Sequence, residues 1–189
     1  MATSALLEDG NLLGERTGTP GRLLEDVDEL LTGVDAEPNE LEQIVVGTGP
    51  GSFTSLRTGL AASRALAFAL DAQVAGVSTL EALAAGAPAA LPLIDARRRE
   101  VFTLIDGKPV AALPNELRDG LLRGRTCVGD GAVRYREVLE AAGAEIPPDD
   151  SELHVPSASV HARLAREFGP AELVEPIYVR VPDADRPRR

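Results

Sequence analysis

The sequence predicts a mixed α/β protein in which strands and helices alternate. Short apolar runs that suit buried strands are followed repeatedly by longer segments whose apolar residues recur at helical spacing. The chain has 189 residues, of which 44% are hydrophobic and 26% charged. This composition is typical of a globular protein that buries a core without disulfides. We therefore expect a largely parallel sheet with antiparallel hairpins at one edge.

The N-terminal segment predicts a hairpin followed by a helix. Residues 4–7 and 12–15 flank a turn whose Asp9-Gly10 pair suits a tight hairpin. A helix is expected to open at Thr19-Pro20-Gly21 and to end at Gly33, because leucine and valine recur at helical spacing between them.

The next stretch predicts two strands joined by a long helix. The strands are expected at residues 44–46 and 74–77, and the helix at residues 52–70. The second strand leads into Ser78 and Glu81, which have the spacing of a capping box and predict a short helix at residues 80–85.

The second half predicts a similar mixture of elements. A strand is expected at residues 91–94, and a second hairpin is expected around Asp106-Gly107. The other predicted elements are strands at residues 101–105, 110–113, 126–128 and 177–181 and helices at residues 115–122, 132–142 and 157–168. Gly143 and Gly169 are expected to end the last two helices.

Charge and cysteine content exclude several classes of function. Thirty acidic residues against 19 basic ones give a net charge of −11, and such a surface disfavours tight binding of nucleic acid without help from a partner. A single cysteine, Cys127, excludes a disulfide framework and a multi-cysteine zinc site. No apolar run is long enough to span a membrane and no basic leader precedes one, so we expect a cytoplasmic protein that does not bind membranes.

The segment from Gly47 to Gly59 carries the most information. A glycine-rich turn between a strand and a helix can hold an anion on its amides. The turn lacks the lysine of a phosphate-binding loop, and Ser52 stands where a dinucleotide fingerprint has its last glycine. The turn is therefore either a weak phosphate site or plain chain geometry, with Ser52 expected to cap the helix.

The helix that follows carries two different faces. Its apolar face suits packing on a sheet, and it is formed by Phe53, Leu56, Leu60 and Ala67. A stripe of small residues lies beside that face, formed by Thr58, Ala62, Ala65 and Ala69. Small residues permit the close approach of another helix, which belongs either to a partner or to this chain.

The residues Gly49-Pro50-Gly51-Ser52-Phe53-Thr54 open a signature that resembles the G-P-G-S-F-T-G-L-R-I-G motif of the bacterial TsaB family, also called YeaZ. The signature continues to Gly59, with Ser55 and Thr58 as departures. Weaker matches follow in the order of the family, at residues 76–84, 95–102 and 176–180. The family normally has a strand of the type L-A-I-D-T-A before the residues that match Ala2–Leu7, and we expect this strand to be missing here.

The resemblance implies a two-lobed actin-like fold of the Hsp70 and ribonuclease-H-like class, with a degenerate second lobe. The lobes are expected at residues 1–96 and 97–189, with a seam near Ala96–Arg99 and a frayed tail at residues 182–189. The implied function is that of a non-catalytic scaffold for the threonylcarbamoyl-adenosine modification of tRNA. The chain would bind and activate the catalytic subunit TsaD, and the complex would then bind TsaE. No cofactor or metal is implied, and the chain is expected to form a homodimer when TsaD is absent.

The expected partner-binding surface combines the first helix and the long helix. It is formed by Leu23, Val27, Leu30, Leu31, Phe53, Leu56, Arg57, Thr58, Ala62, Ala65 and Ala69. Arg57 pairs either with a carboxylate of the partner or with one of the first helix. Asp95, Arg97 and Arg98 follow a predicted strand, where they form either a contact at the edge of a cleft or a solvated turn between the lobes.

Three enzymatic alternatives have weaker support. His154 and His161 are seven positions apart with Pro156 between them, so they do not share a helix face that could bind a metal. Cys127 lies in an apolar strand without a neighbouring base, which disfavours a peptidase. A weak ATPase would use the amides of Gly49–Ser52. A sugar-kinase-like enzyme would need a second-lobe glycine site, for which Gly129-Asp130-Gly131 is the candidate and is equally a turn that opens a helix.

Overall fold

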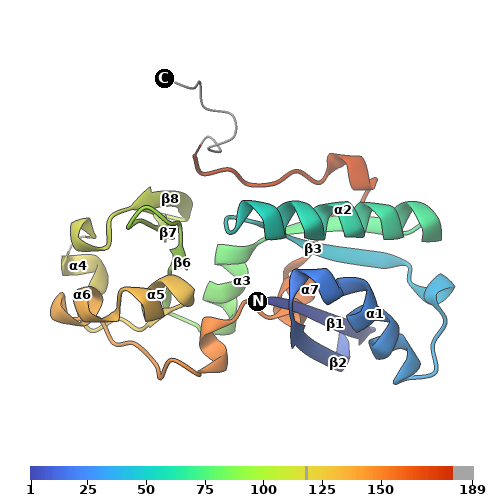
Figure 1. The fold of residues 1–189 in the computed structure, drawn as a ribbon, viewed down its shortest axis with the longest axis horizontal. Coiled ribbons are helices and arrows are strands. Elements are labelled where there is room, and N and C mark those ends of the chain that lie inside the picture. The colour runs from blue at the N-terminus through green and yellow to red at the C-terminus, as the bar shows by residue number, and fades with distance from the viewer. Residues whose placement is uncertain (118, 181–189) are drawn as a thin grey trace.

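The computed structural model describes residues 1–117 and 119–180 and has two groups of elements with α3 (Thr79–Gly86) between them (Figure 1). The first group holds β1 (Ala2–Glu8), β2 (Asn11–Gly18), β3 (Gln43–Gly49), β4 (Gln73–Ser78), α1 (Leu23–Thr32), α2 (Phe53–Leu70) and α7 (Ala158–Leu164). The second group holds β5 (Leu91–Pro92), β6 (Ile94–Asp95), β7 (Val101–Ile105), β8 (Lys108–Ala112), β9 (Cys127–Val128), α4 (Asp119–Leu122), α5 (Asp130–Arg134) and α6 (Arg136–Ala141). The predicted tail at residues 182–189 lies outside the described residues.

The strands of the described residues form four small sheets and not one continuous sheet. β3 and β4 pair in parallel, as do β5 and β9, whereas β1–β2 and β6–β7–β8 are antiparallel. Two strand pairs are parallel, as expected. The prediction of one largely parallel sheet is wrong, because the strands of the described residues are divided among four sheets. Both predicted hairpins form, and their turns place Asp9, Gly10, Asp106 and Gly107 at positive φ, as such tight turns require.

Helices cover both faces of the β3–β4 pair. Val46 and Val74 pack against Leu56 and Leu60 of α2 on one face. On the other face Ala75 and Val77 pack against Ala165, with Leu164 and Phe168 nearby. The second layer is supplied by α7 and the residues after it. A segment late in the chain therefore covers a strand pair that is formed much earlier in the sequence.

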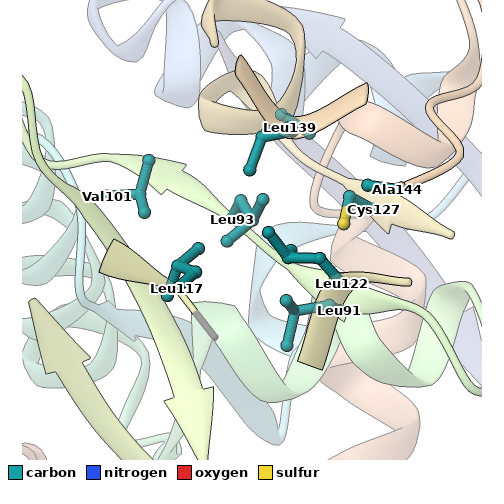
Figure 2. Packing of buried hydrophobic residues seen from close by; sticks show 9 residues of the cluster. Leu91, Leu93, Val101, Leu117, Leu122, Cys127, Leu139 and Ala144 are labelled. Atoms are coloured by element: carbon teal, nitrogen blue, oxygen red, sulfur yellow. The ribbon is translucent and has the colours of Figure 1, made fainter. Parts of the chain in front are cut away.

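A separate core lies in the second group of elements (Figure 2). Its central side chains are fully buried, and they are Leu91, Leu93, Val101, Leu122, Cys127, Ala132 and Leu139. They come from strands β5, β7 and β9, from the residue after β5 and from the helices α4 to α6, so these short elements are held together mainly by this shared apolar cluster.

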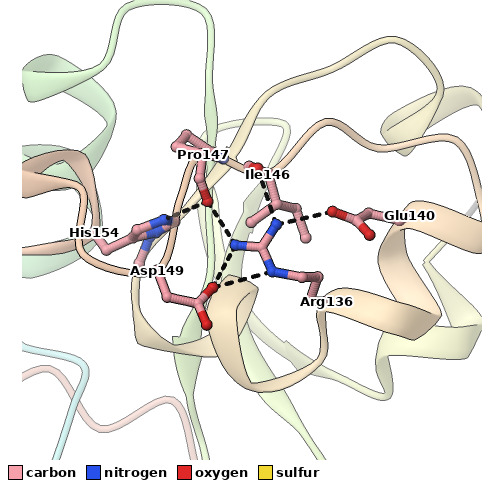
Figure 3. Close-up of polar contacts among 7 residues, drawn as sticks. Arg136, Glu140, Ile146, Pro147, Asp149 and His154 are labelled. Carbon is pink, nitrogen blue, oxygen red and sulfur yellow. Dashed lines mark hydrogen bonds and ion pairs between the residues drawn. The ribbon is translucent and has the colours of Figure 1, made fainter.

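Arg136 fixes the segment that follows α6 (Figure 3). Its guanidinium donates hydrogen bonds to the carbonyls of Ile146 and Pro147 and to the carboxylates of Glu140 and Asp149. The carboxylates raise the pKa of Arg136 further, first through the hydrogen bond with Asp149. The Pro147 carbonyl also lies 3.2 Å from Nε2 of the buried His154. The same carbonyl therefore contacts the side chains of both Arg136 and His154.

Several predicted boundaries in the second half are wrong. The helix predicted at residues 132–142 divides into α5 and α6 at Tyr135, whose ψ of 24° departs from helical geometry. The helix predicted at residues 157–168 ends at Leu164, so Gly169 does not stop it and instead bridges to Val74. No strand forms within residues 177–180, and residue 181 lies outside the described residues.

Three short 3-10 helices link elements, at Pro38–Glu40, Pro114–Glu116 and Glu152–His154. Two more stand at Pro20–Arg22, before α1, and at Ala171–Leu173. The chain leaves the first group through α3, enters the second group at β5 and returns to the first group at α7. Ala96–Arg99 lies between β6 and β7, and the expected boundary between the lobes at that position stays a prediction. Within the described part of the chain, no helix has the length and apolarity that a membrane span needs.

Candidate functional site

The outward face of α2 is the most distinctive exposed surface of the first group. Thr58, Ala65 and Ala69 are exposed, and Ala62 is half-buried. Phe68 is 91% exposed on the same helix. We call these five residues the α2 face. An aromatic side chain left in water beside small residues is the composition of a contact surface, and Phe68 was not singled out from the sequence.

Much of the rest of the predicted partner surface points inward. Leu30, Leu31 and Leu56 are buried in the chain itself. Leu23 and Val27 are half-buried and line the same hollow as those leucines. The apolar stripe of α1 therefore faces the interior of its own lobe, and the outward apolar residue of this helix is Leu24, which is 56% exposed.

Phe53 and Arg57 hold the last described residues against α2. The Phe53 ring lies 5.8 Å from the ring of Tyr178, and the Arg57 guanidinium lies 4.0 Å above Phe53. Further along α2, Arg64 donates a 2.7 Å hydrogen bond to the Val174 carbonyl. Among the described residues, Arg57 contacts Phe53 and Tyr178 and pairs with no carboxylate of α1, whereas pairing with a carboxylate of a partner stays a prediction. Residues 172–180 run beside α2 (Figure 1), an arrangement that no local pattern indicated.

The glycine-rich turn before α2 is buried in its first part and open at Gly51 and Ser52. Thr48, Gly49 and Pro50 are buried, and a β-carbon on Gly49 would lie 3.2 Å from Leu56. Ser52 occupies the N-cap position, but its side chain accepts no capping hydrogen bond, and only its carbonyl accepts one from the Leu56 amide. The capping prediction for the Ser52 side chain is therefore wrong, whereas Ser78 does cap α3 through the Glu81 amide.

The predicted cleft-edge residues form a compact charged turn. Arg97, Arg98 and Arg99 all have positive φ between 54° and 67°, which is unusual for residues with side chains. The Asp95 carboxylate is 6% exposed and lies 3.2 Å from the guanidinium groups of both Arg97 and Arg134. Two arginines therefore neutralise this aspartate at the junction of β6 and β7.

The second-lobe glycine motif is explained by packing. Gly131 donates a hydrogen bond to the Leu93 carbonyl, and a β-carbon on either Gly129 or Gly131 would overlap the Leu93 backbone. Asp130 accepts a 2.8 Å hydrogen bond from the Asp95 amide. These residues form a turn that opens α5, with Gly129 at the N-cap position.

The side chains considered for catalysis are engaged in structure. Burial raises the pKa of the Cys127 thiol to about 11, which disfavours the nucleophilic thiolate. His154 accepts a hydrogen bond from the Gly129 amide through Nδ1. Among the residues that the structure describes, no group of three or more His, Cys, Asp or Glu side chains could hold a metal ion.

Glu15 caps α7 from a distance, and sequence reasoning missed it because the two are far apart in the chain. Its carboxylate accepts 2.8 Å hydrogen bonds from the Ser157 hydroxyl and the Ala158 amide at the helix start. Partial burial raises the pKa of Glu15, but the hydrogen bonds from Ser157, Ser159 and Ala158 outweigh it, and the pKa lies below the ordinary value of 4.5.

Replacing Glu15 by alanine should destabilise the chain by about 1 kcal/mol at pH 7, which is the usual contribution of a helix cap. Because the folded state lowers this pKa, the stabilisation is present above pH 4.5 and is lost as the pH falls further. Urea unfolding at several pH values measures the difference in the free energy of unfolding between the original chain and Glu15→Ala. The difference in the free energy of unfolding should narrow below pH 4.5. A difference that stays constant down to pH 3 contradicts the assignment.

Comparison with known proteins shows which family this chain resembles. The family model described as TsaD, tRNA N6-adenosine threonylcarbamoyltransferase, matches residues 21–127, which is more than half of the chain. The chain is 41% identical over 86 residues to the tRNA threonylcarbamoyladenosine biosynthesis protein TsaB of Bacillus subtilis and 36% identical over 87 residues to that of Escherichia coli. Each match covers 43% of this chain and 38% of the relative, so the similarity spans under half of the relatives' length.

Solved structures agree with the sequence matches. YeaZ from Pseudomonas aeruginosa superposes with a TM-score of 0.69 at 26% identity, covering 93% of both chains. A second Pseudomonas aeruginosa structure, described as an uncharacterized protein with similarity to peptidase YEAZ, has a TM-score of 0.70 at 27% identity over 94% of both chains. The chain therefore belongs to the TsaD family and, within it, to the TsaB (YeaZ) proteins. Its mixed α/β structure fits the actin-like fold expected for that family.

Proposed function

We propose that the chain is a non-catalytic scaffold that binds and activates TsaD during threonylcarbamoyladenosine modification of tRNA in the cytoplasm. The observation that carries the proposal is the α2 face, where an exposed Phe68 lies on the same helix as a stripe of small side chains. The similarity to TsaB proteins of tRNA threonylcarbamoyladenosine biosynthesis supports the same pathway. The engaged state of Cys127 supports a role without chemistry of its own.

The α2 face suits a helix of a partner for a physical reason. Thr58 Oγ1 donates back to the Thr54 carbonyl, so this hydroxyl needs no water when it is covered. Alanine side chains let a facing helix approach closely, and Phe68 and Leu24 would lose their exposed area in the contact. TsaD would thus dock on α2 and the outer side of α1, with Arg57 and Arg64 at the rim and TsaE joining afterwards.

Ala65→Leu tests this surface. Overpacking a closely fitted contact costs about 1–3 kcal/mol, and about 1.4 kcal/mol is a factor of ten in affinity. We expect binding to TsaD, measured by calorimetry, to weaken at least tenfold. The melting temperature of the free chain should not change when it is measured at a concentration where the chain is monomeric, because Ala65 is exposed.

Two matched variants control the experiment. Ala65→Ser keeps the side chain small and should bind as the original chain does. Ala141→Leu places the same added bulk on an exposed position of α6 in the other group of elements and should also leave binding unchanged. If Ala65→Leu binds TsaD with unaltered affinity, the proposed surface is wrong.

The same face should support a homodimer when TsaD is absent, because two copies present identical small-residue surfaces to each other. Size-exclusion chromatography of the mixed proteins would then show TsaD displacing one copy. A homodimer that persists in Ala65→Leu would place the self-association elsewhere.

A further inference from the structure

Residues 174–180 form a strap that lies along α2 in the first group of elements and ends against the second group (Figure 1). Within the described part of the chain, the Ile177 amide donates to the Thr48 carbonyl, and no other backbone group of residues 175–180 bonds to backbone. The strap is therefore held mainly by its side chains. Segments with so few backbone hydrogen bonds detach from a structure more easily than its core opens.

Tyr178 attaches the strap to the beginning of α2. Its ring lies 5.8 Å from that of Phe53, and its hydroxyl accepts a 3.5 Å hydrogen bond from Arg57. The Arg57 guanidinium also lies over the Phe53 ring, so the three side chains form one cluster. Tyr178 is 43% exposed, which places this contact at the surface. A change on α2 beside Arg57 therefore acts directly on the strap.

Val179 and Arg180 attach the strap to the second group. Val179 packs against the apolar cluster of α3, β6 and β7 that contains Phe102. The Arg180 guanidinium donates hydrogen bonds to the Ala96 carbonyl and to the Glu100 carboxylate. Ala96 and Glu100 stand immediately before and after the three consecutive arginines of the charged turn. One side chain of the strap thus contacts both ends of this turn.

The turn from Ala96 to Glu100 is strained. Its three arginines all have positive φ, which costs free energy in any residue with a β-carbon. Such strain persists only where surrounding contacts impose it. Asp95 holds one side of the turn through the amide and the guanidinium of Arg97, and Arg180 holds the other side. Loss of the Arg180 contacts would therefore favour a second, relaxed conformation of the turn.

We propose that the strap is a latch that couples the beginning of α2 to the conformation of the turn at residues 96–100. While Tyr178 lies on Phe53, Arg180 keeps the turn in its strained form. When Tyr178 leaves α2, the contacts of Arg180 are lost as well and the turn relaxes. Because α2 and the turn belong to different groups of elements, a change in one group alters the other. The latch does not depend on the proposed docking of TsaD.

Amide hydrogen exchange measured by NMR tests the end of the latch at the turn. The amides of Ala96, Arg97 and Glu100 donate hydrogen bonds within the turn and its flanking residues, so their exchange reports its conformation. We expect Arg180→Ala to speed their exchange at least tenfold. Arg163→Ala removes a guanidinium from an exposed position on α7 and should leave these rates unchanged. Unchanged exchange in Arg180→Ala overturns the proposal.

Tyr178→Ala tests the coupling from the other end, because it removes the ring that lies against α2. We expect it to speed the exchange of the same three amides at least fivefold. Tyr178→Phe keeps a ring in contact with Phe53 and should behave as the original chain does. If Tyr178→Ala leaves the turn unchanged, the strap contacts the two groups independently and the latch does not exist.

The amides that join β7 and β8 separate release of the turn from general destabilisation. They lie in the same group of elements but outside the turn, and their exchange should not change in Arg180→Ala or Tyr178→Ala. If they speed up as much as the amides of the turn, the variants have destabilised the second group as a whole. That result also overturns the proposal.

Discussion

Replacing Gly129 by alanine is expected to destabilise the chain by about 3–5 kcal/mol, which is a large share of the stability of a typical domain. Gly129 has φ of 104° and ψ of 168°, a region that residues with a β-carbon scarcely enter. A β-carbon there would lie 2.3 Å from the Leu93 carbonyl oxygen. Backbone strain and overlap add up because β5 and the start of α5 cannot move apart without breaking the hydrogen bond from Gly131 to Leu93.

Urea unfolding followed by circular dichroism measures this effect. Gly124→Ala is the matched control, because Gly124 also has positive φ, of 66°, but nothing lies within 4 Å of the position of its β-carbon. The control carries the conformational cost alone, about 1–2 kcal/mol. If Gly129→Ala loses no more stability than Gly124→Ala, the close approach to Leu93 is not a determinant of the fold.

Replacing Leu139 by alanine is expected to cost about 2–5 kcal/mol. This side chain is fully buried in the core of the second group of elements (Figure 2). Its removal leaves a cavity among Leu93, Leu122 and their neighbours, and these short helices and strands have little else to hold them in place.

The adjacent Val138 gives the control for this substitution. Val138 is 43% exposed on the same helix, so Val138→Ala should change the free energy of unfolding by no more than about 0.5 kcal/mol. The comparison separates loss of packing from any change in helix propensity. Similar losses in the two variants would contradict the importance of this core.

Much of the fold could be predicted from local patterns. The two hairpins followed from Asp-Gly turns, and α2 and α3 followed from apolar spacing and the Ser78 cap. Predictions failed where distant contacts override local preference. The helix predicted at residues 157–168 ends early because the segment around Gly169 pairs with Val74. The segment after Glu175 lies beside α2, with the Ile177 amide bound to the Thr48 carbonyl, although its composition suits a strand.

The candidate site was predictable only in part, for a similar reason. The small-residue stripe of α2 could be located from spacing alone, and it proved largely exposed. The outward side of α1 could not be predicted from spacing, because Leu23 and Leu24 are adjacent and equally apolar. Only the position of the hairpin decides which of them is covered. The role of Glu15 could not be predicted from local patterns either, because its partner Ala158 lies 143 positions later in the chain.

The return of α7 to the first group of elements has a consequence for the order of folding on the ribosome. The strands β3 and β4 are synthesised early, yet the layer over one of their faces comes from Leu164, Ala165 and Phe168. The elements from β5 to α6 are contiguous in the chain and contain their own core. The middle of the protein can therefore acquire its native packing while the nascent chain is still growing, whereas β3 and β4 must wait for α7 and the residues after it.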